Sequence, residues 1–448
     1  MHVIALGVDV GTTNLKVCRV PDGSVRSVRT PDDAEALQHA VRRLVAELSE
    51  GQHVDAIGIT AMAETGVPLD RELRPLTKLI TWRDQPGVEQ AQQLDAELGA
   101  AALYARTGLR LSPKLPLVTW RWLRDTQPEL AARTRLWAGV PDLVLAALTG
   151  SHAMHLTHAQ RLGVLDLQRR QWDQELLEYG GLDLPPVVEP MTVAASTPDG
   201  VPVVLCGHDH LVGAWAAGVR EPGQVADSLG TAEAVITPSP GLVLDDELRQ
   251  QGISMSWYVD GQHGCAVSGN GAAGGLVEQR LTAVDRDYTW LHSVLEPVGP
   301  PSDRFIAPYP QGRQAPAPDP TSTYDVTRRV DDPAEDLRAL VDALSFHARW
   351  MAEEQTRLLG IDWRSTVAFG GPVRLGGWMA RKACATGGRA FAVLDDQAAA
   401  AQGAALMAAE VVTGQPSKPL PSRLLAVDPQ LTETWDGAFW HRFHKVVS

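Results

Sequence analysis

The chain has 448 residues, of which 44% are hydrophobic and 21% are charged, and its formal net charge is -14. This length exceeds what one simple core holds, so about two or three globular domains are expected. The acidic balance argues against broad electrostatic binding to nucleic acid or to an anionic membrane. The sequence has no apolar run of about 18 residues, so a transmembrane helix is not predicted.

The cysteines and the N-terminus point to a cytoplasmic protein. No basic segment followed by an apolar segment and a cleavage site opens the chain, so no secretory signal is predicted. The cysteines form no Cys-x-x-Cys pair and no zinc-like spacing, which predicts free thiols. They are Cys18, Cys206, Cys265 and Cys384.

The first predicted element is a buried strand over Val3–Val10, interrupted by a carboxylate at Asp9. A buried charge needs a partner, and Gly11 directly after the strand permits a tight turn. Thr12 and Thr13 add hydroxyls and backbone N–H groups, so the turn predicts an anion nest beside an Asp suited to hydrated magnesium. An ordinary hairpin with a solvated Asp explains this segment equally well.

The next elements alternate between strands and helices. We predict a hairpin partner strand over 17–20, a helix over 34–48 with apolar residues at helical spacing, and a strand over 54–60. A mostly helical stretch over 88–150 precedes another apolar strand over 201–206. This alternation favours a layered α/β fold.

Two carboxylates lie beside predicted strands in the first half. Glu64 follows the strand over 54–60, and Asp84 follows the apolar residues Leu79 and Ile80. Together they could accept hydrogen bonds from the hydroxyls of a polyol or an open-chain sugar. From these residues alone, solvated loop carboxylates are the favoured interpretation.

The strand over 201–206 delivers Gly207, His208, Asp209 and His210 at its end, where open α/β folds place reactive groups. Asp209 is a candidate general base for a substrate hydroxyl. The His-Asp-His order also suggests a metal site. Since adjacent residues on an extended chain point in opposite directions, hydrogen-bonding or packing roles are favoured for the two histidines.

A short internal repeat opens the second half. Val225-Ala-Asp-Ser228-Leu-Gly230-Thr231 has the pattern of Val8-Asp9-Val-Gly11-Thr12, with an apolar lead before Gly-Thr. Chance similarity is the rival explanation. A true repeat predicts two related domains, 1–219 and 220–448, that clamp a nucleotide between their turns.

The later elements include a long helix with clear end signals. An irregular loop over 302–327 is followed by Asp332 as a predicted N-cap, Glu335 as its capping-box partner and Gly360 as the C-terminal stop. A strand over 366–369 comes next. Two further helices are predicted, around 378–386 and around 398–410.

Glycine turns in the second half offer two weak signals. Gly269-Asn-Gly271-Ala-Ala-Gly274 matches a dinucleotide-binding pattern, but its context is poor and a tight helix-entry turn is favoured. Gly370 and Gly371 follow a predicted strand and would let the backbone approach a ligand. The chain contains no P-loop sequence.

Taken in order, these motifs resemble the FGGY family of carbohydrate kinases, within the actin/hexokinase/heat-shock ATPase superfamily. The resemblance covers about Val3 to Ala409. The segments that carry it are Asp9-x-Gly11-Thr12-Thr13-x-x-Lys16, Gly58 through Thr65, Trp82-x-Asp84, Gly207-x-Asp209, Ser228-x-Gly230-Thr231, Pro308-Tyr309 with Gly312, Asp319-Pro320, Phe369-Gly370-Gly371 and Gly403-Ala404-Ala405.

The resemblance implies an α/β protein with two actin-like (ribonuclease H-like) domains, each a mixed β-sheet flanked by helices, around an ATP and sugar cleft. It implies a kinase that uses ATP and Mg²⁺, with Asp209 as the base and Asp9 holding magnesium through water. The implied sugar contacts are Glu64, Trp82, Asp84, Asp209 and His210. The implied ATP contacts are Gly11, Thr12, Thr13, Lys16, Gly230, Thr231, Gly274, Gly370 and Gly371.

Departures from the family pattern fall mostly on the sugar side. Ala63 stands where glycerol kinases have Arg, His210 replaces the usual Gln, and Pro372 alters the third glycine turn. The expected substrate is therefore a ketose such as a pentulose, or a polyol, and a homodimer is left open. A non-catalytic sugar or nucleotide sensor and, more weakly, a nicotinamide-dependent oxidoreductase are the rival functions.

Overall fold

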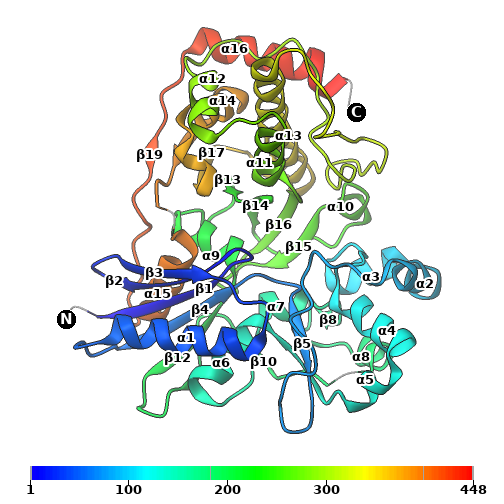
Figure 1. Ribbon diagram of the computed structural model, residues 1–448, viewed down its shortest axis with the longest axis vertical. Helices are drawn as coiled ribbons and strands as arrows, with labels where there is room; N and C mark the ends of the chain where they lie inside the picture. The colour runs from blue at the N-terminus through cyan, green and yellow to red at the C-terminus, as the bar shows by residue number, and fades with distance from the viewer. Residues whose placement is uncertain (1–2, 182, 397, 446–448) are drawn as a thin grey trace.

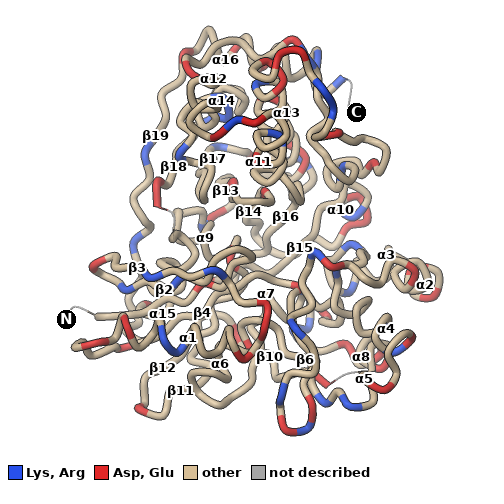
Figure 2. Tube along the Cα trace, in the orientation of Figure 1, with Lys and Arg blue, Asp and Glu red and all other residues tan. Residues whose placement is uncertain are grey.

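The computed structural model describes residues 3–181, 183–396 and 398–445, and this part of the chain forms two large β-sheets, of six and seven strands, and three two-stranded sheets, with helices around them. The first sheet lies in the lower part of Figure 1 and the second in the upper part. Figure 2 shows Lys and Arg interspersed with Asp and Glu along both halves of the chain. In the described part of the chain, no helix is both long and apolar enough to cross a membrane.

The first sheet has the strand order β11-β12-β4-β1-β2-β3. Its central strand β1 pairs antiparallel with β2 and parallel with β4, so the predicted hairpin is confirmed. The hairpin strand is longer than predicted, because the chain turns back directly after Gly11–Thr13. The strands are β1 (Ala5–Val10), β2 (Asn14–Val20), β3 (Ser24–Arg29), β4 (Ala56–Ala61), β11 (Val193–Ser196) and β12 (Pro202–His208).

The second sheet repeats this arrangement. Its central strand β13 forms an antiparallel hairpin with β14 and pairs parallel with β17, and a Gly-Thr turn again connects the hairpin. The predicted internal repeat is therefore a repeat of topology. The order is β15-β16-β14-β13-β17-β18-β19, with bounds β13 (Gln224–Leu229), β14 (Glu233–Ser239), β15 (Ser254–Trp257), β16 (Gly264–Asn270), β17 (Ser365–Gly370), β18 (Ala390–Val393) and β19 (Arg423–Leu424).

Helix α1 (Ala34–Ser49) shows how the sequence fixes a covering helix. Its N-cap Asp33 accepts a hydrogen bond from the Ala36 N–H, and the apolar stripe that includes Leu37, Val41 and Leu44 is buried against the first sheet. The other elements of the first half are β5 (Gly66–Leu69), α2 (Val88–Leu98), α3 (Ala100–Thr107), α4 (Pro116–Thr126), α5 (Pro128–Arg133), β6 (Leu136–Gly139), α6 (Val140–Thr149), β7 (Met154–His155), α7 (Leu156–Gln160), β8 (Leu165–Asp166), β9 (Gln171–Trp172), α8 (Gln174–Gly180), β10 (Val187–Val188) and α9 (Asp209–Ala216).

Helix α13 (Pro333–Leu359) begins and ends where predicted. The Asp332 carboxylate accepts from two first-turn N–H groups, and Gly360 closes the helix in the left-handed conformation. The predicted capping box is wrong, because the Glu335 carboxylate instead binds the Ser302 hydroxyl and the Arg338 guanidinium. The remaining elements are α10 (Asp246–Gln250), α11 (Ala273–Ala283), α12 (Tyr288–Leu295), η1 (Gly371–Arg374), α14 (Gly376–Ala385), α15 (Ala399–Thr413), α16 (Pro429–Ala438) and η2 (Phe439–His444).

Helix α15 belongs to the second half of the chain but packs on the first sheet, next to β1 and β4 (Figure 1). The contact is so close that a Cβ at Gly7 would overlap the Ala401 carbonyl oxygen, and one at Gly58 would overlap that of Ala404. Glycine is therefore required at both strand positions. The strands respect the predicted division at 219/220, while α15 crosses it.

Candidate functional site

A cavity of about 370 Å³ lies between the two sheets and is lined by both halves of the chain. The turns β1–β2 and β13–β14 line it together with residues that follow β4 and β12, and the strands β1, β4 and β12 end side by side at this edge of the first sheet. The cavity gathers most of the residues that the sequence singled out, namely Asp9, Gly11, Thr12, Thr13, Lys16, Glu64, Trp82, Asp209, His210, Gly230 and Thr231.

Asp9 is buried at the end of β1, and its Oδ1 atom has no hydrogen-bond partner within the described chain. The pKa of this carboxyl is raised to about 7, mainly by burial and also by the neighbouring Asp209, while Lys16 opposes the shift. Two carboxylates that face each other without an intervening cation destabilise their ionised forms. Hard oxygen donors of this kind fit Mg²⁺, so the site is compatible with the magnesium that the sequence predicts.

The two Gly-Thr turns are held by their own backbones. In the first, the Gly11 N–H donates to the Asn14 carbonyl (3.1 Å), and the Thr30 hydroxyl donates to the Gly11 carbonyl (2.7 Å). In the second, the Gly230 N–H donates to the Ala232 carbonyl (2.8 Å). The first turn is also linked to the cavity wall, because the Trp82 indole N–H donates to the Thr12 hydroxyl (3.1 Å). Rigid turns of this type suit phosphate groups.

Glu64 also lines the cavity, three residues after the end of β4, in the left-handed conformation with φ 56°. Arg161 donates to its Oε1 atom through Nε (2.8 Å) and through a second guanidinium nitrogen, and the Lys114 Nζ lies 3.6 Å from the same oxygen. Burial raises the pKa of Glu64, but Arg161 and Lys114 outweigh burial and hold it below its ordinary value. Glu64 is therefore an ionised carboxylate that accepts from two cations.

Sequence reasoning missed Lys114 and Arg161. Arg161 interrupts an otherwise largely apolar run at the end of α7, and a charge in such a run is a signal that could have found it. Lys114 lies in the irregular segment before α4 and carries no comparable signal.

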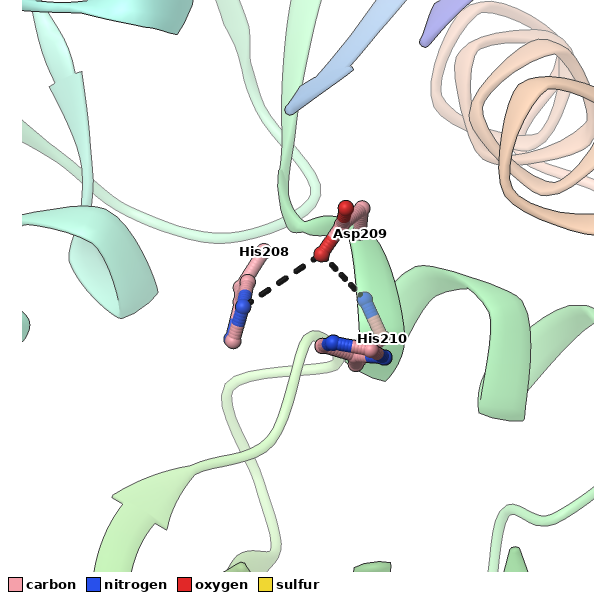
Figure 3. A group of neighbouring side chains, drawn as sticks. All are labelled: His208, Asp209 and His210. Carbon is pink, nitrogen blue, oxygen red and sulfur yellow. Dashed lines mark hydrogen bonds and ion pairs between the residues drawn. The ribbon is translucent and has the colours of Figure 1, made fainter. Parts of the chain in front are cut away.

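Asp209 is the first residue of α9 and shares its Oδ1 atom between two neighbours. The His210 backbone N–H donates to this oxygen at 2.7 Å, and the His208 Nε2 lies 3.3 Å from it (Figure 3). Burial lowers the pKa of His208 well below its usual value, with contributions from His210 and Arg161, so the ring is neutral. The second carboxylate oxygen faces neither of these groups.

The side chains of His208, Asp209 and His210 converge, which contradicts the expectation that neighbours on a strand point apart. The strand ends at His208 and the helix begins at Asp209, so the chain changes direction between them. Gly207 permits this with φ 111°, a conformation that favours glycine. The Thr157 hydroxyl then accepts from the His208 N–H at 2.9 Å and fixes the turn.

His210 also connects the two halves of the chain. Its Nδ1 lies 2.8 Å from the hydroxyl of Ser228, which is on β13 just before the second Gly-Thr turn. The base candidate and the second turn are therefore positioned by one shared contact.

Four of the predicted site residues do not line the cavity. Asp84 is exposed, and its carboxylate accepts from the N–H (2.6 Å) and the hydroxyl (2.9 Å) of Thr81, which makes it a turn cap. Gly274 packs directly against the second turn, with its N–H donating to the Gly230 carbonyl (3.2 Å). Gly370 lies behind that turn with φ 111°, and Gly371 next to it is exposed.

Comparison with known proteins agrees with this architecture. Residues 29–216 match the model of the N-terminal domain of the FGGY family of carbohydrate kinases. A gluconokinase of Bacillus subtilis (strain 168) is 22% identical over 263 residues, which is 52% of this chain and 51% of the relative. A rhamnulokinase of Yersinia pestis is 31% identical over 173 residues, 37% of this chain and 35% of the relative. The chain thus spans about half the length, or less, of these curated relatives.

Solved structures extend the likeness over nearly the whole chain. A structure described as a xyloylose kinase from Brucella ovis superimposes with a TM-score of 0.89 at 21% identity and covers 99% of this chain and 98% of its own. A gluconate kinase from Lactobacillus acidophilus gives 0.86 at 19% identity, covering 97% and 96%. The two-domain actin-like α/β fold that the sequence predicted is confirmed, and residues 29–216 are similar to the N-terminal domain of the FGGY family of carbohydrate kinases.

Proposed function

We propose that this protein is a kinase that transfers a phosphoryl group from ATP to a hydroxyl of a small carbohydrate, with Asp209 as the general base. One observation carries the proposal. Asp209 lines the same cavity as the two Gly-Thr turns, Asp9 and the Glu64 cluster. A base that shares one cavity with phosphate-binding turns and with groups able to bind hydroxyls is the arrangement that phosphoryl transfer requires.

At the ATP end, the residues of this chain would bind and neutralise charge. When bound, Mg-ATP supplies the phosphoryl group. Gly11, Thr12, Thr13, Gly230 and Thr231 would cradle its phosphates through backbone and hydroxyl donors. Asp9 would hold the magnesium through water, and Lys16 would lie near the same charges. Gly274, Gly370 and Gly371 would act indirectly, by holding the second turn in place.

At the reacting end, Asp209 would take the proton of the attacking hydroxyl. The His210 N–H and the neutral His208 ring engage its Oδ1 atom, which leaves the other oxygen to accept the proton. Positioning and charge neutralisation would supply most of the rate enhancement. Closure of the two halves would keep water from accepting the phosphoryl group instead.

The sugar would lie against Glu64, Trp82 and His210. Carboxylate, indole and imidazole groups together suit a polyhydroxylated chain, so a ketose such as a pentulose, or a polyol, is the first candidate. Asp84 is omitted, since its carboxylate caps a turn.

A second candidate substrate is a sugar acid. Lys114 and Arg161 both bind Glu64 and together carry one positive charge more than it does. An excess cation beside the sugar site favours a substrate with a carboxylate. The gluconokinases and gluconate kinase among the similar proteins are in keeping with this class.

The test is a substrate panel of triose-to-heptose ketoses, polyols and aldonic acids with the full-length protein and Mg-ATP. We expect ADP release with at least one member, and loss of roughly 10³ in turnover in Asp209→Asn with the sugar still bound. Binding without turnover in the wild type would favour a sensor. Absence of both binding and turnover over the whole panel would refute the kinase.

A charge variant separates the two substrate classes. If the substrate is an acid, Lys114→Met should raise its KM by about tenfold or more while kcat changes less. Arg83→Met is the matched control, because Arg83 also lines the cavity but is exposed and lies over the Trp82 ring at 5.1 Å. An equal effect of both variants on acid and neutral substrates would contradict the sugar-acid candidate.

We also propose a cytoplasmic location. Cys18, Cys206, Cys265 and Cys384 are all buried free thiols, which suits a reducing compartment.

A further inference from the structure

His208, Asp209 and His210 bring two imidazoles and a carboxylate to one point of the cavity. One donor atom from each residue lies within 4.8 Å of the donors of the other two (Figure 3). The two imidazole rings meet edge to face, with centroids 5.3 Å apart and an interplanar angle of 87°. Both rings thus approach Asp209 without blocking each other.

We propose that these three residues form a site for a divalent transition-metal ion such as Zn²⁺, Co²⁺ or Ni²⁺, and that an ion bound there inhibits the kinase. Imidazole and carboxylate donors together suit these ions, whereas Mg²⁺ prefers oxygen ligands alone. Magnesium at the ATP end would therefore not compete for this site. The inhibitory part rests on the proposed function, because an ion bound to the Asp209 carboxylate would neutralise the negative charge with which its other oxygen would accept the hydroxyl proton.

The geometry requires only small movements. Ligands about 2.1 Å from one ion lie about 3.4 Å apart in a tetrahedral arrangement and about 4.2 Å apart on opposite sides of the ion. The three donors, which lie within 4.8 Å of one another, are close to these separations. The present 3.3 Å contact between His208 Nε2 and Asp209 Oδ1 marks the point where the ion would insert.

Neighbouring groups hold the two histidines in place from both halves of the chain. Thr157 accepts the His208 N–H, and the Ser228 hydroxyl lies 2.8 Å from Nδ1 of His210. A hydrogen bond at one ring nitrogen orients the other toward a metal, which is the usual support around metal-ligating histidines. Because Ser228 is on β13, an ion bound here would also tie the second Gly-Thr turn to α9.

Direct binding tests the site without any substrate. The full-length protein is titrated with Co²⁺ in buffer containing millimolar Mg²⁺, and the visible absorption of bound Co²⁺ is followed, with Zn²⁺ displacing it in calorimetry. We expect one equivalent to bind, and His208→Gln and His210→Gln each to weaken binding at least tenfold. The matched control is His263→Gln, which removes a histidine paired with Asp260 (2.7 Å) outside the cavity.

Three outcomes decide the proposal. The proposal is supported if one ion binds per chain, if His208→Gln and His210→Gln both weaken this binding, and if His263→Gln leaves it unchanged. No binding, or equal binding by all variants, overturns it. If His208→Gln fails to fold by circular dichroism, His210→Gln alone carries the comparison.

The inhibitory role has its own measurement. With a substrate from the panel, Zn²⁺ should inhibit the wild type reversibly, with relief by a chelator selective for Zn²⁺ over Mg²⁺. In His210→Gln, the inhibition constant for Zn²⁺ should rise together with its dissociation constant. If the inhibition constant does not change in parallel with the dissociation constant of the ion, the inhibitory role is wrong but the metal site is still supported. If the protein has no kinase activity, the Co²⁺ absorption still tests the metal site by itself.

Discussion

Asp9 illustrates how a single residue balances binding against stability. Its carboxylate is buried, has an oxygen without a partner and faces Asp209. In the unliganded protein, the ionised form of such a carboxylate lowers the free energy of unfolding. A cation bound beside it stabilises this ionised form.

The Asp9 pKa gives the unliganded protein a defined pH dependence. The pKa of Asp9 in the folded protein is about 7, whereas the unfolded chain releases the proton near the ordinary pKa of 3.8. The folded state therefore binds more protons between these values, and the free energy of unfolding should fall as pH rises from about 4 to about 7. Asp9→Asn should remove this pH-dependent contribution and raise the free energy of unfolding at pH 8 by on the order of 1 kcal/mol.

Urea unfolding at pH 5 and pH 8 checks this prediction, with exposed Asp199→Asn as the control. Asp9→Asn should also lose affinity for Mg-nucleotide in calorimetry. A variant that is less stable than wild type at pH 8 would show that the ionised carboxylate is compensated by contacts within the protein.

At the scale of elements, the β13–β14 hairpin depends on a buried lysine from α14. Lys382 forms ion pairs with Asp227 on β13 and Glu233 on β14, on either side of the second Gly-Thr turn, and all three side chains are buried. Burial raises the pKa of Glu233 to about 8, Lys382 opposes the shift, and Asp227 adds to it. The lysine thereby fixes both strands that carry the turn.

Lys382→Met should destabilise the protein by about 3–5 kcal/mol, because it leaves two buried carboxylates without their cation. The matched control is Lys78→Met, which removes an exposed pair with Asp32 (2.8 Å) and should change the free energy of unfolding far less. Chemical denaturation measures both values. Similar losses in the two variants would contradict a special role for the buried lysine.

The packing of α15 on the first sheet gives a second prediction at this scale. Gly58→Ala should destabilise the protein by about 1–3 kcal/mol, since its methyl group would collide with the Ala404 carbonyl of α15. Gly437→Ala is the control, because it lies inside helix α16 with open space around it and should be neutral or slightly stabilising. Thermal unfolding distinguishes the two, and an unchanged midpoint in Gly58→Ala would show that α15 can move away.

At the scale of the whole molecule, the two sheets present equivalent hairpin turns to one cavity. A nucleotide bound between them should slow amide hydrogen exchange in residues 11–14 and 230–233 together. The exposed loop over 197–200, far from both turns in sequence, serves as the internal control. Protection of one turn without the other, measured by mass spectrometry with Mg-nucleotide, would contradict binding between the halves.

The sequence predicted much of this architecture because its signals are local. Strand, turn and helix ends at Asp9–Thr13, Ser228–Thr231 and Asp332 follow from residues within a few positions of each other. Contacts between distant segments were missed: nothing near Glu64 announces Lys114 or Arg161. The convergence of Asp209 with its two histidine neighbours was missed because the chain turns from strand β12 into helix α9 between His208 and Asp209, where the alternation of an extended chain no longer applies.

Helix α15 has a consequence for how the protein is made. The face of the first sheet that it covers is built from residues before 220, but the helix itself is synthesised only at residues 399–413. During translation that apolar face remains open while more than a hundred further residues emerge from the ribosome. The first half therefore completes its core last, and chaperones have a defined surface to protect in the meantime.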